Sequence, residues 1–510
     1  MEKANEIIHE NNAPENPQAQ GEDGEVEPKE ITAKDSQGMI LQHTELYNGA
    51  MNISAALNEA GKRKEEFRED LKVLAKIPSV SFPGFDPKTV VASAEAVAAL
   101  MTRRGLEHVE ILRLPGAHPY VYGDWLHAPG KPTLLLYAHH DVQPAGREEL
   151  WESPPFQPTE RGGRLYGRGT ADDKAGAVIH TSAVASWLKA GGGLPLNVKV
   201  IIEGEEEIGS EHLETFLKKY AKKMSADAMV LTDTGNYDVG VPSITTSLRG
   251  MAALDVTVRA ADHPLHSGMW GGPIPDPVQA LSKMISSVTD LAGNIAIPGI
   301  LKGARPPGAA ELRSMASLRY TEAALRKQSG VLPNSRLLGK GPLLRRLWRE
   351  PSFSVNAIQA SNKKDCANII NEAAWCHMGI RLVPGMDPKN SMRLLKAHLL
   401  ENAPWGVKVE FSKETTNPAW TTSPDAPAFQ AAARALGRGF GREAVFIGCG
   451  GSIPFVGPFS RVLGGVPALL IGVEDPYTNP HSENESLHLG DFQKSILSAV
   501  HLYSELAATL

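Results

Sequence analysis

The sequence predicts an α/β fold in which a mostly parallel sheet domain is interrupted by a smaller, inserted α+β domain. Two observations predict it. In the first and last parts of the chain, short apolar runs alternate with helical patterns, which is typical of a largely parallel sheet. In the middle, the patterns follow the order βα…ββαβ, which is typical of a split-βαβ, ferredoxin-like domain.

The first part of the parallel sheet is predicted between residues 77 and 238. In Leu196–Ile202, Val198, Val200 and Ile202 alternate along a predicted strand. Pro132–Tyr137 and Ala228–Leu231 are short, continuous apolar runs. Such runs are typical of strands that are covered on both faces, as strands of parallel sheets are. Each run leads directly into polar residues, and ligands bind at the carboxyl ends of strands in this class of sheet.

The pattern changes near residue 244, where the inserted domain is predicted to begin. Leu254, Val256 and Val258 alternate with polar residues, as in a strand with one buried face. Further strands are predicted at 353–358, 373–382 and 407–411, and helices at 277–291 and 388–402. The stretch 302–350 is rich in Gly, Pro and Arg and resembles loops rather than core.

The α/β pattern returns after about residue 416. Ser423 is the predicted N-cap of a helix that has Pro424 at its first position and runs to Gly437. Buried strands follow at 445–447 and 468–473. A last amphipathic helix carries Phe492, Ile496 and Val500 on one face. The predicted domain organisation is a disordered acidic segment (1–52), a first sheet part (53–243), the inserted domain (244–415) and a second sheet part (416–510).

Charge and cysteine usage exclude several classes of protein. Residues 1–35 carry ten acidic and three basic side chains, and the remaining chain carries 48 acidic against 49 basic. An electrically balanced body argues against a dedicated nucleic-acid binder. Three cysteines without a CxxC pair argue against a disulfide framework and for a reducing compartment. The sequence shows neither a signal peptide nor an apolar run of the ~18–20 residues that span a bilayer, so we expect a cytoplasmic protein without a membrane partner.

Five groups of metal-ligand residue types follow the predicted strands. They are His139-His140-Asp141, Asp172-Asp173-Lys174, Glu205-Glu206-Glu207, Asp233 and His481. Each group alone is weak evidence, because acidic runs are usually solvated and single histidines are usually structural. Together they fall where parallel strands bring residues to one edge of a sheet. Crowded carboxylates repel one another unless a cation neutralises them, so the coincidence predicts a metal centre.

These segments resemble the signatures of one enzyme family, the co-catalytic metallopeptidases and deacylases related to carnosinase, acetylornithine deacetylase, succinyl-diaminopimelate desuccinylase and glutamate carboxypeptidase. The similar stretches are Tyr137–Gly146, Leu165–Lys174, Glu203–Ser210, Pro242–Gly250, His266–Gly272, Arg381–Pro384 and Gly450–Pro454. The resemblance covers most of residues 60–508. The form of Asp141–Pro144 and the long second signature resemble the carnosinase-type dipeptidase branch most.

The resemblance implies a centre of two divalent metal ions, with Zn²⁺ as the leading choice and Mn²⁺ or Co²⁺ as alternatives. Asp172 would bridge the two ions. The other metal ligands would be His139 and Asp233 on one ion, and Glu207 and His481 on the other. The general base would be Glu206, and Asp141 would orient the His139 imidazole.

The resemblance also implies a substrate site that the inserted domain completes as a lid and dimerisation domain. In relatives, the histidine equivalent to His266 comes from the partner subunit of a homodimer and stabilises the oxyanion. Arg381 resembles the clamp for the substrate carboxylate. Gly451 and Ser452 would offer backbone groups to the same end of the substrate, and Asn356 is a further candidate contact.

Three positions depart from the family pattern. Ala138 stands where relatives have Gly, and Pro264 stands where they have Asp. Gly448-Cys449 replaces the Arg-Glu pair that carnosinase-like members commonly carry. No departure removes a predicted metal ligand, but the last two lie near the expected substrate and therefore bear on specificity.

The resulting functional prediction is a metal-dependent exopeptidase that hydrolyses dipeptides or short peptides with a free carboxylate. An amidohydrolase or deacylase of N-acyl amino acids is the alternative, because both classes cleave an amide beside a carboxylate. A non-catalytic scaffold on the same fold is disfavoured, because the predicted ligands and the general base are all present in the sequence.

Overall fold

The computed structural model describes residues 53–364, 366–451, 453 and 456–510. The predicted disordered segment 1–52 lies outside these residues. The described part is a mixed α/β structure with one large sheet, mostly parallel at its centre, and smaller antiparallel sheets. The predicted fold class is confirmed.

The large sheet contains nine strands. They are β1 (Glu107–Leu112), β2 (Tyr120–Trp125), β3 (Thr133–His139), β6 (Asn197–Glu203), β7 (Ala228–Leu231), β8 (Ser243–Leu248), β15 (Trp420–Thr421), β16 (Val445–Cys449) and β17 (Ala468–Ile471). Their order is β1-β2-β6-β3-β7-β17-β8-β15, and β16 pairs with β8. The neighbours β6, β3, β7 and β17 run parallel, so their carboxyl ends meet at one edge of the sheet.

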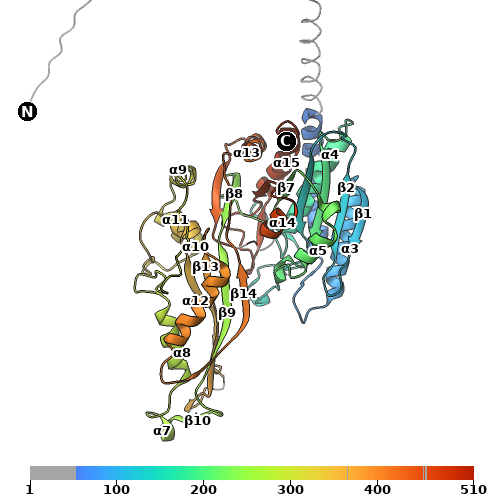
Figure 1. The fold of residues 1–510 in the computed structure, drawn as a ribbon. Helices are drawn as coiled ribbons and strands as arrows, with labels where there is room; N and C mark the ends of the chain where they lie inside the picture. The colour runs from blue at the N-terminus through green and yellow to red at the C-terminus, as the bar shows by residue number, and fades with distance from the viewer. Residues whose placement is uncertain (1–52, 365, 452, 454–455) are drawn as a thin grey trace, which may run out of the picture. The chain divides into compact units, whose positions relative to one another are not determined.

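The C-terminal part of the chain supplies a strand to the interior of this sheet. β7 and β8 follow one another in the sequence, yet β17 lies between them and pairs with both. The sheet therefore combines strands from both sides of the inserted segment (Figure 1).

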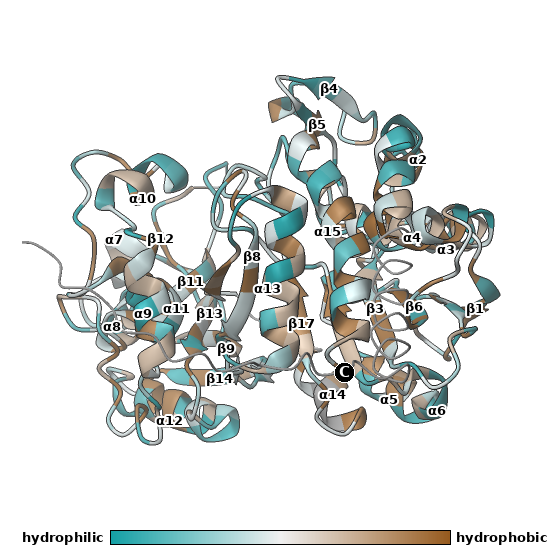
Figure 2. Ribbon diagram, turned by 90° about the horizontal axis from the view of Figure 1, so that it is seen from above, coloured by the Kyte–Doolittle hydropathy of each residue, from teal (hydrophilic) through white to brown (hydrophobic). Residues whose placement is uncertain are grey.

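Alternating side chains bury both faces of the large sheet. In β3, Leu134 and Leu136 belong to one core and Leu135 and Tyr137 to the other, because successive side chains of a strand point to opposite faces. The helices of the first core include α2 (Lys64–Ala75), α3 (Pro87–Arg103), α4 (Lys174–Lys189), α13 (Pro427–Phe440) and α15 (Leu489–Ala507). The second core contains α5 (Leu213–Lys219) and α14 (Val456–Val462). Figure 2 shows hydrophobic residues along the central strands between these layers.

The middle of the chain forms a second sheet with its own core. Its strands are β9 (Gly250–Arg259), β11 (Ser352–Gln359), β13 (Ala373–Leu382) and β14 (Lys408–Asn417), antiparallel in the order β11-β13-β9-β14. Leu254, Val256 and Val258 of β9 are buried against α8 (Pro277–Ser287) and α12 (Pro388–Glu401). We refer to this sheet and its helices as the lid, and the predicted boundaries 244–415 remain a prediction.

Two local expectations were wrong. The stretch 302–350 contains three helices, α9 (Ala309–Ser317), α10 (Glu322–Ser329) and α11 (Leu343–Arg349). Each is short and has at most two buried residues, and glycine or proline lies close to both ends of the stretch, so its composition resembles that of loops. The helix α13 begins at Pro427 rather than Pro424, because the Ser423 hydroxyl accepts the Asp425 N–H in a turn before the helix.

A two-stranded ribbon lies at the end of the lid that is remote from the large sheet (Figure 1). It pairs β10 (Leu265–His266) with β12 (Ile369–Ile370), and α7 (Ser267–Trp270) follows β10 directly. Among the described residues, no helix combines the length and apolar character required to cross a membrane.

Candidate metal centre

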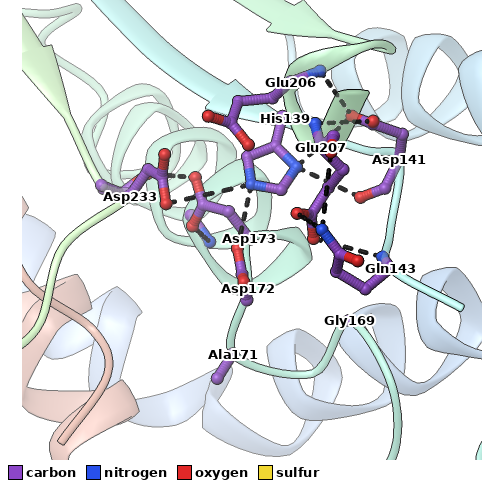
Figure 3. Close-up of polar contacts among 12 residues, drawn as sticks. His139, Asp141, Gln143, Gly169, Ala171, Asp172, Asp173, Glu206, Glu207 and Asp233 are labelled. Atoms are coloured by element: carbon purple, nitrogen blue, oxygen red, sulfur yellow. Dashed lines mark hydrogen bonds and ion pairs between the residues drawn. The ribbon is translucent and has the colours of Figure 1, made fainter. Parts of the chain in front are cut away.

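The carboxyl ends of the parallel strands bring the predicted ligands together. His139 is the last residue of β3, and Asp233 follows β7 by two residues. Glu206 and Glu207 begin a short 3₁₀ turn after β6. His139 is fully buried, and Figure 3 shows Glu206, Asp172 and Asp233 gathered around its ring.

Asp172 lies between two histidines. Its Oδ1 is 3.0 Å from His139 Nε2, and its Oδ2 is 3.1 Å from His481 Nε2. Two groups of potential ligands share this carboxylate, and the ligand atoms within each group lie within 4.8 Å of one another. The groups are His139, Asp172 and Asp233, and Asp172, Glu207 and His481.

A small antiparallel sheet brings His481 to this place. It pairs β5 (Arg164–Tyr166), which precedes the Asp172 loop, with β18 (Ser486–His488), which follows the His481 loop, and β4 (Thr159–Arg161) flanks β5. His481 Nε2 is 3.2 Å from Glu207 Oε2, so the loop contributes to the second group although it lies far along the chain.

Asp141 links His139 to the turn that carries Glu206. Its Oδ1 lies 3.4 Å from His139 Nδ1 and accepts the Glu206 N–H at 3.2 Å. Its Oδ2 accepts the Glu207 N–H at 3.1 Å and the Ser81 hydroxyl at 2.7 Å. The His139 Nδ1 also lies 3.1 Å from the Asp141 backbone carbonyl, and the Asp141 carboxylate fixes the backbone of the predicted general base; the orientation of the imidazole by this carboxylate remains a prediction.

Glu207 is held by Gln143, one of the residues in the first signature. The Gln143 backbone N–H donates to Glu207 Oε1 at 3.2 Å, and the side-chain amide donates to Glu207 Oε2 at 2.8 Å. These bonds direct the Glu207 carboxylate toward His481.

Glu485 fixes the loop that carries Asp172. This fully buried carboxylate accepts the backbone N–H groups of Gly169, Ala171 and Asp172 at 3.0, 3.0 and 3.2 Å. It also accepts Arg168 Nη1 at 2.8 Å, while Arg168 Nη2 donates to the Pro144 and Ser482 carbonyls. One buried ion pair thus joins three separate loops around the centre.

The charges of the site call for a cation. Burial raises the pKa of the Glu206 and Asp233 carboxyls well above their usual range, and neighbouring carboxylates add to the rise. Burial alone would lower the pKa of His481, but Asp172 and Glu207 raise it to about 11, which shows that a positive charge is favoured between these carboxylates. Imidazole and carboxylate are ligands that suit Zn²⁺, Mn²⁺ and Co²⁺. The donor set fits two divalent cations.

We expect Glu485→Gln to weaken metal binding about 10–100-fold, the usual cost of losing a group that orients a ligand. Glutamine keeps the size of the side chain but replaces one acceptor oxygen with a donor, which opposes the N–H groups of the Asp172 loop. Isothermal titration of the metal-free protein with Zn²⁺ measures the effect. Glu483→Gln, on the same loop but paired with the exposed Arg147, is the control and should bind as the wild type does. Equal affinities for all three proteins would contradict the role of Glu485.

The predicted substrate residues lie outside these two groups. Arg381 is half-buried in β13, opposite Ser352 of β11. The Gly451 N–H donates to Cys449 Sγ at 3.3 Å, and Ser452 lies outside the described residues. Asn356 is exposed at an irregularity in the pairing of β11 with β13.

His266 is not brought to the metal centre within the chain. It is an exposed residue of the remote ribbon, and its Nδ1 accepts the Gly268 N–H at 3.1 Å.

Comparison with known proteins gives consistent matches. The family model described as "Peptidase family M20/M25/M40" matches residues 135–507. The chain is 34% identical to cysteinylglycine-S-conjugate dipeptidase of Corynebacterium striatum over 70% of this chain and 77% of that protein. It is 30% identical to the Cys-Gly metallodipeptidase dug1 of Schizosaccharomyces pombe, covering 90% of this chain and 99% of that one.

A solved structure gives the same result. The crystal structure of human carnosine dipeptidase 1 superposes with a TM-score of 0.80 at 26% identity, over 89% of this chain and 99% of that chain. The similarity therefore extends over the large sheet and the lid together.

Proposed function

The chain belongs to peptidase family M20/M25/M40, and from that premise we propose that it is a metal-dependent dipeptidase. The family resemblance drawn from the sequence motifs is confirmed, including the carnosinase-type branch. One observation carries the proposal: two groups of ligand atoms share the Asp172 carboxylate, next to the half-buried Glu206, which belongs to neither group (Figure 3).

The chemistry divides between the ions and the side chains. One divalent cation would have His139, Asp172 and Asp233 as ligands, and a second would have Asp172, Glu207 and His481. The two cations would polarise the substrate carbonyl and make water more acidic. Glu206 accepts the proton of the attacking water, because its raised pKa suits a general base that must later release the proton. The same carboxyl then donates that proton to the leaving amine.

The substrate class follows from the relatives and from two neighbouring arginines, Arg249 between β8 and β9 and Arg381 in the lid sheet. Relatives of this chain are named as dipeptidases for Cys-Gly and β-Ala-His. Arg249 Nη1 donates to the Ser352 hydroxyl at 2.9 Å, and Ser352 lies opposite Arg381 in the lid sheet. Two neighbouring guanidinium groups suit a free carboxylate, which we place at the C-terminal end of a dipeptide, with Gly451 and Ser452 at the same end.

Zn²⁺ is the proposed ion, on the strength of two histidines among carboxylates. We also place the protein in the cytoplasm, because Cys366, Cys376 and Cys449 are free thiols.

The experiment that tests the function is hydrolysis of a panel of dipeptides and N-acyl amino acids by purified protein. The assay is run after chelation and again after Zn²⁺ or Mn²⁺ is restored. Metal-dependent cleavage of dipeptides supports the proposal. Turnover of N-acyl amino acids alone would instead assign the protein to the deacylases, and no turnover by metal-loaded protein would contradict both.

A homodimer through the lid is part of the proposal. β11 is an outer strand of the lid sheet, and its Val355 and Ile358 are 36% and 57% exposed. Met269, three residues after His266, is 74% exposed. An apolar strand edge and an apolar tip on one domain suit a second copy of the same chain, which would bring its His266 to the metal centre.

Mixing two inactive variants tests this arrangement. We expect His266→Ala and Glu206→Gln to be inactive separately and to recover about a quarter of the wild-type activity when unfolded and refolded together in equal amounts, because half of the dimers are mixed and each mixed dimer has one intact site. Recovery is measured by dipeptide hydrolysis, with the molar mass determined by light scattering. A monomer, or a dimer without recovered activity, would contradict the exchange of His266 between subunits.

A further inference from the structure

A pocket of about 210 Å³ lies beside the glycine-rich strand end at 448–450. Whole small-molecule sites typically enclose roughly 300–1,000 Å³, so this pocket has the size for one side chain of a ligand. Three aromatic residues line it, Tyr237, Tyr320 and Trp348, together with Gln328. None of the described residues that line it is charged.

The stretch 302–350 forms one wall of this pocket and is tied to the large sheet. The Tyr237 hydroxyl donates to the Leu318 carbonyl at 2.9 Å, and the Tyr237 and Tyr320 rings lie 6.1 Å apart. The Ser314 hydroxyl donates to the Phe446 carbonyl of β16 at 2.5 Å. These contacts fix the aromatic wall in place against the sheet.

Gly448 makes room for Trp348. A Cβ atom at position 448 would lie 2.8 Å from Trp348 Cβ and 2.7 Å from Ser247 Oγ, closer than atoms pack. The arginine that carnosinase-like members commonly carry here is incompatible with this position of Trp348. The glycine at position 448, which departs from the family pattern, therefore leaves the space that Trp348 occupies in the aromatic wall.

The pocket lies beside the loop of a predicted metal ligand and beside the place proposed for the substrate carboxylate. Gly235 and Asn236 line it and follow Asp233, a predicted metal ligand, in the same loop. On its other side, Arg249 Nε donates to the Gly450 carbonyl at 2.8 Å. Arg249 is also the residue that contacts Ser352 opposite Arg381, so the pocket begins where the substrate carboxylate is placed.

We propose that this pocket receives a large apolar side chain, preferably aromatic, on the dipeptide residue that carries the free carboxylate. The proposal rests on the dipeptidase function above. Aromatic side chains gain from stacked or edge-to-face contacts with Tyr237, Tyr320 and Trp348. A charged side chain would lose water without gaining a partner among the described lining residues, which disfavours acidic and basic residues at this position.

The test compares kcat/KM for Ala-Trp, Trp-Ala and Ala-Ala. We expect the wild type to prefer Ala-Trp, and Trp348→Ala to lower kcat/KM for Ala-Trp about tenfold while Ala-Ala and Trp-Ala change little. Trp348→Phe should recover most of the preference. Trp405→Ala, which removes an exposed tryptophan of the lid outside the pocket, is the matched control. Thermal unfolding of each variant verifies that it is folded.

The outcomes separate the two proposals. An equal loss for all three dipeptides, or a loss confined to Trp-Ala, would overturn the assignment of the pocket while the dipeptidase function stands. An unchanged preference in folded Trp348→Ala would do the same. Failure of the wild type to cleave any dipeptide would overturn the proposed function, and the pocket assignment with it.

Discussion

Glu206→Gln is expected to lower kcat for dipeptide hydrolysis about 10²–10⁴-fold, the range that a general acid-base group contributes. Glutamine has nearly the same shape but accepts no proton from water at neutral pH. Glu206 belongs to neither group of ligand atoms, so the variant should bind as much metal as the wild type. Steady-state kinetics and metal analysis by mass spectrometry on the same sample measure both quantities.

Glu211→Gln is the control for this prediction, because Glu211 is an exposed glutamate shortly after the same turn. It should leave kcat unchanged. If Glu206→Gln kept wild-type kcat, the proton transfer would have to be assigned to another residue. If it lost metal as well as activity, Glu206 would be a ligand instead of the base.

Asp172→Asn is expected to remove the metal centre as a whole. The substitution takes a negative charge from both ligand groups, so we expect the bound metal to fall from two ions per chain to less than one. Activity should fall at least about 100-fold, which is more than the usual cost of losing a group that only orients a ligand. Glu207→Gln is the matched comparison. Glu207 belongs to only one ligand group, so this variant should lose one ion and keep the other.

Thermal unfolding gives a second measure of the same change. A ligand that binds the folded state stabilises it by about 2.7 kcal/mol at a hundred times its Kd. Added Zn²⁺ should therefore raise the Tm of the metal-free wild type and have little effect on Asp172→Asn. Two bound ions in Asp172→Asn would show that this carboxylate is not the shared ligand.

Local patterns predicted much of the fold because the order of apolar and polar residues along a segment indicates which of its side chains are buried. The apolar run before His139 is buried on both faces and forms β3, and the 373–382 strand has the predicted bounds. The position of β17 between β7 and β8 is a pairing of distant segments, which no local pattern contains. The helices of 302–350 were missed because they are short and bury few residues, so they lack a clear apolar stripe.

The same distinction holds for the site. Residues that can bind metal are recognised by type and by their place after a strand, and the structure brings His139, Asp172 and His481 together. Gln143 lay within the first signature and could have been identified there. Ser81 and Glu485 reach the site from 60 residues before Asp141 and 316 residues after Gly169, so nothing near those positions marks them. The catalytic roles remain predictions for the variants above.

The place of β17 also has a consequence for biosynthesis. A nascent chain makes β7 and β8 long before the strand that separates them in the sheet, so until then both strands expose unpaired N–H and C=O groups. The loop with His481 follows β17, so the ion site is completed only after β17 and this loop have been translated. A polypeptide whose synthesis stops before β17 therefore lacks the strand between β7 and β8, and it also lacks His481 of the metal centre. Its unpaired strand edges would favour aggregation, and it would lack the second group of ligands.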